Sequence, residues 1–141
     1  MNRGKFVIVV AMFALTALPA AALHLKDLQL RDDKGAVRKD NKVPQGSHIF
    51  FTYDIDDLIV DPNTKKVNYQ RTIELLDNSK KVLFKTTEWK EISPNTKSIL
   101  DGFTIQIPPN QPPGAYSIKV SVTDTNAKGG RGIIYPIEVT K

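Results

Sequence analysis

The side chains with the clearest chemical potential in this sequence are acidic residues that gather within one short stretch. Hard cations such as Ca²⁺ take six to eight oxygen ligands, which carboxylates and amide carbonyls can supply. Asp and Asn are also favoured in turns, where they bond to the local backbone, so an idle role for the same residues stays open. The spacing predicts a calcium site with the ligands Asp54, Asp56, Asp57, Asp61 and Asn63.

Residues for nucleophilic or acid–base catalysis are few. The chain has two histidines, His24 and His48, and no Gly-x-Ser-x-Gly motif that would expose a nucleophilic serine. It has no cysteine, which removes thiol nucleophiles and cysteine-based zinc sites. We therefore expect no catalytic residues, no enzyme activity and no cofactor other than the calcium ion considered above.

The first 22 residues have the pattern of a secretory signal peptide. Two basic residues, Arg3 and Lys5, precede an uncharged apolar run over residues 6–18, and Ala20 and Ala22 put small side chains at the recognition positions of a cut after residue 22. The run is marginal for a membrane span, which needs about 20 apolar residues. We expect an exported chain, periplasmic or secreted, with no permanent membrane anchor and a mature domain over residues 23–141; an uncleaved anchor is the alternative.

The charge of the mature chain bears on its partners. The full sequence carries a formal net charge of +5, and loss of Arg3 and Lys5 lowers it to +3. This mild balance gives no ground for nucleic-acid binding. The partner expected for an exported chain of this kind is a protein or an envelope glycan.

The mature chain has the pattern of an all-β domain. Apolar residues alternate with polar ones in short runs, and turn residues interrupt the runs every 8 to 12 positions. In the first run, Leu23 and Leu25 alternate in one phase and Leu28 and Leu30 in the other, which predicts a bulge or a change of sheet near residues 26–27. About seven strands, each with one apolar face, predict an antiparallel two-sheet β-sandwich.

The last third of the sequence resembles the immunoglobulin-like family. Residues 103–107, a proline-rich crossing and residues 114–118 are similar to its E strand, E–F corner and F strand. In that family a tyrosine two positions before the second cysteine ties its hydroxyl to the corner backbone. The resemblance, which extends to disulfide-free bacterial relatives and fibronectin III-like domains, implies structural roles for Gly114, Tyr116 and Ile118, the last in the cysteine's place.

This architecture hosts many functions, so the resemblance implies a fold and no activity. We expect an exported, non-catalytic interaction or structural module that presents an edge strand or the loops over residues 54–66 and 124–132. The alternative is a carbohydrate-binding or enzyme-accessory domain, stabilised by calcium. Sugar binding needs exposed aromatic rings, and of Trp89, Tyr69 and Tyr53 the alternation favours burial of the two tyrosines.

Overall fold

The computed structural model describes residues 23–94, 98–127 and 129–141. These residues form eight strands and no helix. The strands are β1 (His24–Arg31), β2 (Lys42–Pro44), β3 (His48–Asp56), β4 (Val67–Leu76), β5 (Val82–Ile92), β6 (Ser98–Gln106), β7 (Gly114–Asp124) and β8 (Gly129–Thr140).

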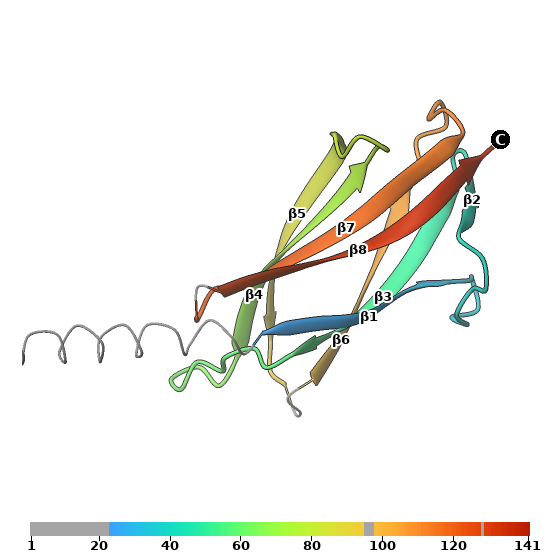
Figure 1. Cartoon of the computed structure of the whole chain (residues 1–141). Helices are drawn as coiled ribbons and strands as arrows, with labels where there is room; N and C mark the ends of the chain where they lie inside the picture. Colours follow the sequence, from blue (N-terminus) through green and yellow to red (C-terminus); the bar gives the residue numbers. More distant parts are fainter. Residues whose placement is uncertain (1–22, 95–97, 128) are drawn as a thin grey trace, which may run out of the picture.

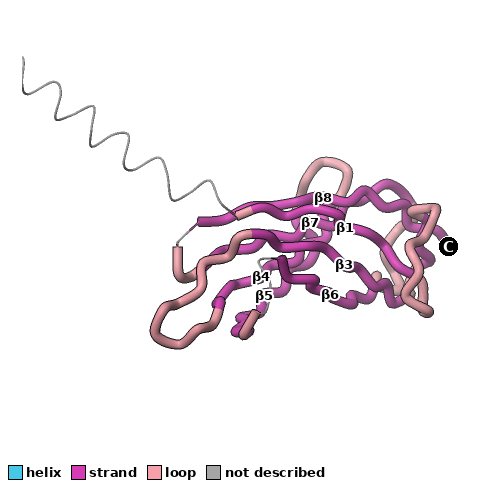
Figure 2. Tube along the Cα trace, turned by 90° about the horizontal axis from the view of Figure 1, so that it is seen from below, coloured by secondary structure: helices cyan, strands magenta, loops and turns pink. Residues whose placement is uncertain are grey.

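The strands form two sheets that pack together, an arrangement consistent with a β-sandwich (Figure 1). One sheet has the order β1-β3-β6, and the other has the order β2-β8-β7-β4-β5. All the pairings are antiparallel except that of β2 with β8. Long loops lie at both ends of the strands (Figure 2).

The core follows from the period-2 alternation of the strands, which points every second side chain to one face. In β4, Val67, Tyr69, Arg71, Ile73 and Leu75 are buried, and the residues between them are only partly buried. The other sheet contributes Phe51, whose ring stacks on that of Phe103 with their centroids 5.3 Å apart. The largest fully buried side chains come from both sheets: Tyr53, Tyr69, Phe51, Leu30, Ile55, Leu75, Ile107, Ile118, Ile137, Val43, Val67 and Val120.

The irregularity expected near the start of the domain is a bulge within β1. The pairing of β1 with β3 changes register between Lys26 and Gln29, and Asp27 has a positive φ of 57°. The extra length restores Leu28 and Leu30 to the buried face. The predicted change of phase is therefore confirmed, and it occurs inside one strand.

The loop expected over residues 124–132 is much shorter than predicted. β7 continues to Asp124 and β8 already begins at Gly129, with Thr123 opposite Gly130 and Ser121 opposite Gly132. The glycines suggested a loop because glycine weakens a strand. Here they occupy paired positions beside β7, so most of this segment is a β-hairpin.

The predicted signal peptide, residues 1–22, lies outside the described residues, and so do residues 95–97 and 128. Among the residues that are described, there is no helix with the length and apolar character needed to cross a membrane.

Candidate functional site

The acidic residues predicted to bind calcium are used in different local interactions. Asp56 forms an ion pair with Lys26, 2.9 Å from its Nζ, which lowers the pKa of the Asp56 carboxyl. Asp61 accepts a hydrogen bond from the backbone N–H of Asn63 at 2.8 Å, as turn aspartates do. Within the described ranges, no three His, Asp or Glu residues lie together as a metal site would need. The calcium site stays a prediction, and the structure gives it no support.

Asp54 and Asp57, the other two predicted carboxylate ligands, have different surroundings. Asp54 lies on β3, where partial burial and the nearby carboxyl of Asp27 raise its pKa. Asp57 follows β3 with a positive φ of 64° and is exposed. Asp54 therefore belongs to the end of β3, and Asp57 is the first residue of the loop that follows.

The two histidines lie beside opposite ends of β3. His48 is its first residue, and His24 pairs with Asp56, its last. Ser98 of β6 pairs with Asp56 from the other side, so the order across the sheet is His, Asp, Ser. A catalytic triad needs the imidazole between the other two groups, so this row does not have that arrangement.

The loops predicted as contact surfaces are bonded to each other through Asp124. Its side chain is almost fully buried and accepts hydrogen bonds from the backbone N–H groups of Ile59 at 2.8 Å and of Asn126 at 3.0 Å. The amide of Asn126 in turn donates to the Ile59 carbonyl at 2.8 Å. These bonds fix the loop over residues 57–66 against the β7–β8 turn.

The residues that carry the family resemblance lie at the other end of the sheets. The Tyr116 hydroxyl donates to the Pro112 carbonyl at 2.7 Å and accepts from the Gln111 amide at 3.0 Å. Gly114 has φ 149°, a conformation that side-chain-bearing residues rarely adopt, and Ile118 is fully buried. The tyrosine therefore closes the proline-rich crossing back onto the first residues of β7.

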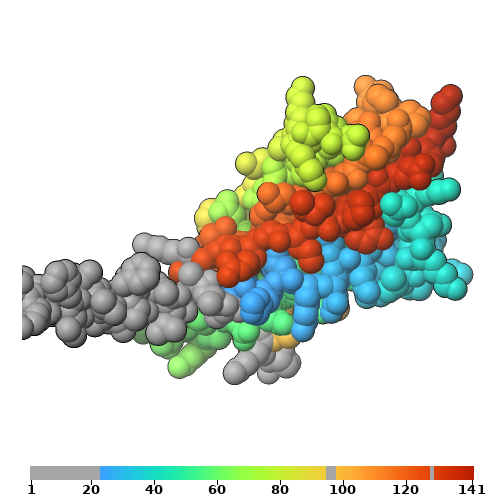
Figure 3. Space-filling model, in the orientation of Figure 1, coloured from blue at the N-terminus to red at the C-terminus, as the bar shows by residue number. Residues whose placement is uncertain are grey.

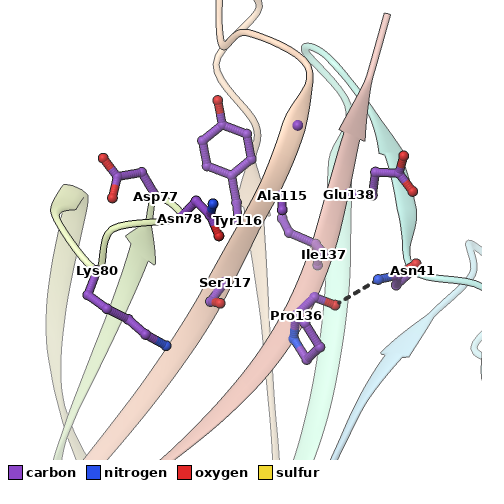
Figure 4. A pocket seen from close by; sticks show the side chains of 11 residues that line it. Asn41, Asp77, Asn78, Lys80, Ala115, Tyr116, Ser117, Pro136, Ile137 and Glu138 are labelled. Atoms are coloured by element: carbon purple, nitrogen blue, oxygen red, sulfur yellow. Dashed lines mark hydrogen bonds between the residues drawn. The ribbon is translucent and has the colours of Figure 1, made fainter.

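A shallow hollow of about 440 Å³ lies beside this corner (Figure 4). The β4–β5 turn, the start of β7 and the end of β8 line it. Its one aspartate, Asp77, already accepts bonds from the N–H groups of Ser79 and Lys81, both at 2.9 Å. Asn41 is bonded to the Pro136 carbonyl. The side chains of Asp77 and Asn41 are therefore both engaged within the protein.

A buried ionic network, which no motif in the sequence predicts, crosses between the sheets. Arg71 of β4 lies 2.8 Å from the carboxylate of Asp101 on β6, which also accepts a 2.6 Å bond from the Tyr53 hydroxyl. A second Arg71 nitrogen lies 2.6 Å from Glu88 on β5. Burial and the Asp101 carboxylate raise the pKa values of Tyr53 and Tyr69. The network ties β3, β4, β5 and β6 together on one side of the molecule.

On that side, β5 and β6 are the last strands of their sheets, and no strand among the described residues pairs with their outer edges. The β4–β5 hairpin projects from the body of the molecule (yellow-green in Figure 3). β5 has no buried residue along its 11 positions. Of the ten large hydrophobic side chains that are exposed among the described residues, five lie on these two strands, namely Val82, Leu83, Phe84, Trp89 and Leu100. We call this surface the open edge.

Trp89 is the most exposed of these residues, with 69% of its surface accessible, whereas Tyr53 and Tyr69 are fully buried as the alternation predicted. Its side chain lies on the outer face of the five-stranded sheet, because its neighbours Glu88 and Lys90 pair with the inward-facing Arg71 and Tyr69. Among the described residues, Trp89 is therefore the one large aromatic side chain exposed on this face.

The hydrogen-bond pattern of β4 determines which backbone groups of β5 are free. The Asn68 carbonyl accepts from Thr125 N–H at 3.0 Å, so the even-numbered residues of β4 bond towards β7 and the odd-numbered ones towards β5. Between Phe84 and Ile92, the even-numbered residues of β5 are their partners; a bulge breaks this alternation at Leu83. The N–H and C=O groups of Lys85, Thr87, Trp89 and Glu91 consequently point away from the sheet.

No protein-family model matches this chain, and no curated protein matches it significantly.

Proposed function

We propose that the chain is an exported, non-catalytic interaction module that receives an extended strand of a partner protein on its open edge. The observation that carries the proposal is β5, an 11-residue outer strand with unpaired backbone groups and exposed apolar side chains. Natural proteins normally shorten, cover or interrupt such edges, because they pair readily with other chains. Addition of a strand is the binding mode that this surface fits.

The strand order supports an immunoglobulin-like assignment for the module. In that fold strands A, B, E and D form one sheet, and strands G, F and C, with C′ in some members, form the other. β1, β3 and β6 correspond to A, B and E, and β8, β7, β4 and β5 to G, F, C and C′. The hydrogen bond of Tyr116 to Pro112 corresponds to the corner bond of the family. Strand D has no counterpart among the described residues, and its place is beside β6, at the open edge.

Carbohydrate binding is the second candidate, and the exposure of Trp89 favours it. An indole ring at 69% exposure could stack on a sugar. Tryptophan is also among the residues enriched at the centres of protein interfaces. We prefer the protein partner, because Val82, Leu83 and Phe84 extend the apolar surface along the same strand, whereas a sugar site would need further rings.

Site-specific photo-crosslinking in the source cells tests the proposed function. A photoreactive residue at Leu83 should give a discrete crosslinked product, and the same residue at Ile134 should not. Ile134 is the matched control, because it is at least as exposed as Leu83 (46% against 38%) and lies on the same sheet but on β8. Replacement of Thr87 by proline in the Leu83 variant should abolish the product. Equal products from Leu83 and Ile134, or no product from Leu83, would contradict the proposal.

The same cells test the export part of the proposal. The mass of the chain recovered from the envelope or the medium should correspond to a first residue of Leu23. A chain that keeps residues 1–22 would instead support the anchored alternative.

A further inference from the structure

We infer that the partner strand is β5 of a second copy of this chain, paired antiparallel about a two-fold axis. This inference rests on the proposed binding edge and names its occupant. It would join the two five-stranded sheets into one continuous sheet, with β5 of each copy at the centre.

The backbone of β5 restricts which residues of the two copies can be opposed. Lys85, Thr87, Trp89 and Glu91 carry the outward N–H and C=O groups, so these odd-numbered residues must face odd-numbered residues of the second copy. Their side chains all lie on the outer face of the sheet. The outer faces of the two copies are therefore continuous, which requires a two-fold axis perpendicular to the sheet.

One register gives the longest overlap of the strand with itself. β5 runs from Val82 to Ile92, so its central residue is Thr87. With Thr87 on the axis, each residue that precedes Thr87 in one copy lies opposite the residue that follows Thr87 by the same number of positions in the other copy. The opposed pairs then include Phe84 with Lys90 and Lys85 with Trp89, and each pair forms twice. Val82 and Leu83 lie at a bulge of β5, where the regular alternation is interrupted.

The charges of β5 fit this register. The strand is neutral overall, with Lys85 and Lys90 balancing Glu88 and Glu91. In the central register each lysine faces an aromatic ring, where cation–π attraction is favourable, and no like charges are opposed. Lysines on an edge strand normally disfavour pairing with another chain, whereas here they would contact aromatic rings of the second copy.

The neighbouring registers are worse. A shift by two residues in one direction places Glu88 directly opposite its own copy, and like charges directly opposed across strands are destabilising. The same shift in the other direction places Lys85 opposite Thr87 and removes its contact with Trp89; the diagonal contact between the two copies of Lys85 that it creates is matched by one between the two copies of Glu88 in the central register. Either shift also leaves two residues of each strand unpaired. The lysine–aromatic pairs and the length of the overlap therefore favour the central register.

Sedimentation of the full chain recovered from its host tests the pairing. The weight-average mass should double as the concentration rises, and the emission of Trp89, the only tryptophan, should shift to the blue. Replacement of Thr87 by proline should keep the chain single at every concentration. Proline is tolerated on an edge strand whose N–H faces solvent, so this variant should remain folded, which far-ultraviolet circular dichroism checks.

A disulfide trap tests the register. Directly opposed residues in a hydrogen-bonded antiparallel pair have Cα atoms about 5.5 Å apart, which is within the range of a disulfide. Because the chain has no native cysteine, Thr87→Cys should crosslink two copies under mild oxidation. Thr123→Cys, exposed on the same face but on β7, is the matched control and should stay uncrosslinked.

The outcomes separate this inference from the proposed function. A chain that stays single at all concentrations, with equal crosslinking of the two cysteine variants, overturns the self-pairing. In that case a Leu83 photo-crosslink to another polypeptide would leave the binding edge in place with a different occupant. If self-pairing occurs, the Leu83 product should have the mass of two copies.

Discussion

Tyr116 contributes to stability through one hydrogen bond at the surface of the corner. Its hydroxyl donates to Pro112 in a partly exposed position. Tyr116→Phe removes this bond, and we expect a loss of about 0.5–1 kcal/mol in the free energy of unfolding, because water replaces part of what is lost. Urea unfolding of both forms measures the difference. An unchanged midpoint would remove the main support for an immunoglobulin-like corner.

Tyr53 and Tyr69 should resist ionisation for as long as the protein is folded. Their pKa values are raised by burial and by the Asp101 carboxylate, whereas an unfolded tyrosine ionises near pH 10, about its ordinary value. Above that pH the unfolded chain binds fewer protons than the folded one, so stability falls as the pH rises. Below it, the contribution is fully present.

An alkaline titration checks this expectation. The chain has four tyrosines. Part of the phenolate absorbance should appear only together with the loss of the β-sheet signal in circular dichroism. Ionisation of all four phenols while the sheet signal is intact would mean that the network around Asp101 is open to water.

At the scale of the elements, Asp124 couples the loop over residues 57–66 to the β7–β8 hairpin. Asp124→Asn leaves an amide N–H₂ facing the N–H of either Ile59 or Asn126, so one buried hydrogen bond is lost. We expect a cost of about 1–3 kcal/mol in the free energy of unfolding. Asp33→Asn, in an exposed turn, is the control and should leave the thermal midpoint unchanged. Equal effects of the two substitutions would show that the loops are not coupled through this side chain.

The alternation in the sequence predicted most strands, because successive side chains of a strand point to opposite faces and only one face is buried. Phe103 and Ile105 of β6 and Ile118, Val120 and Val122 of β7 are buried, as this alternation requires. The segment over residues 124–132 was predicted wrongly, because glycine composition carries no information on pairing. The alternation of apolar and polar residues does not determine the order of strands in a sheet. The outer position of β5 is therefore known only from the structure.

Most of the candidate site was not predictable for the same reason. Arg71 and Asp101 are residue types that favour the surface, and only the approach of β4 to β6 makes them a buried pair. The acidic residues near the end of β3 looked like ligands because they are close in sequence. Asp54 and Asp56 share one face of β3, whereas Asp57 follows the strand and Asp61 lies in a turn, so among the described residues the carboxylates do not gather as a metal site needs.

At the scale of the whole molecule, the two sheets differ in size, and this difference creates the open edge. Three strands face five, and no strand among the described residues pairs with the outer edge of β6 or of β5. β5 therefore extends as an outer strand whose inner and outer side chains are both accessible. The central claim is that another strand pairs with this edge when the protein works.

Amide hydrogen exchange along β5 tests this claim most directly. In the dilute single chain, the N–H groups of Lys85, Thr87, Trp89 and Glu91 should exchange fast, and those of the even-numbered residues between them should be protected. When the chain is concentrated, or mixed with the polypeptide captured by the Leu83 photo-crosslink, the four outward amides should become protected. If they exchange at the same rate in every condition while the rest of the sheet is intact, no strand pairs with this edge and the account is wrong.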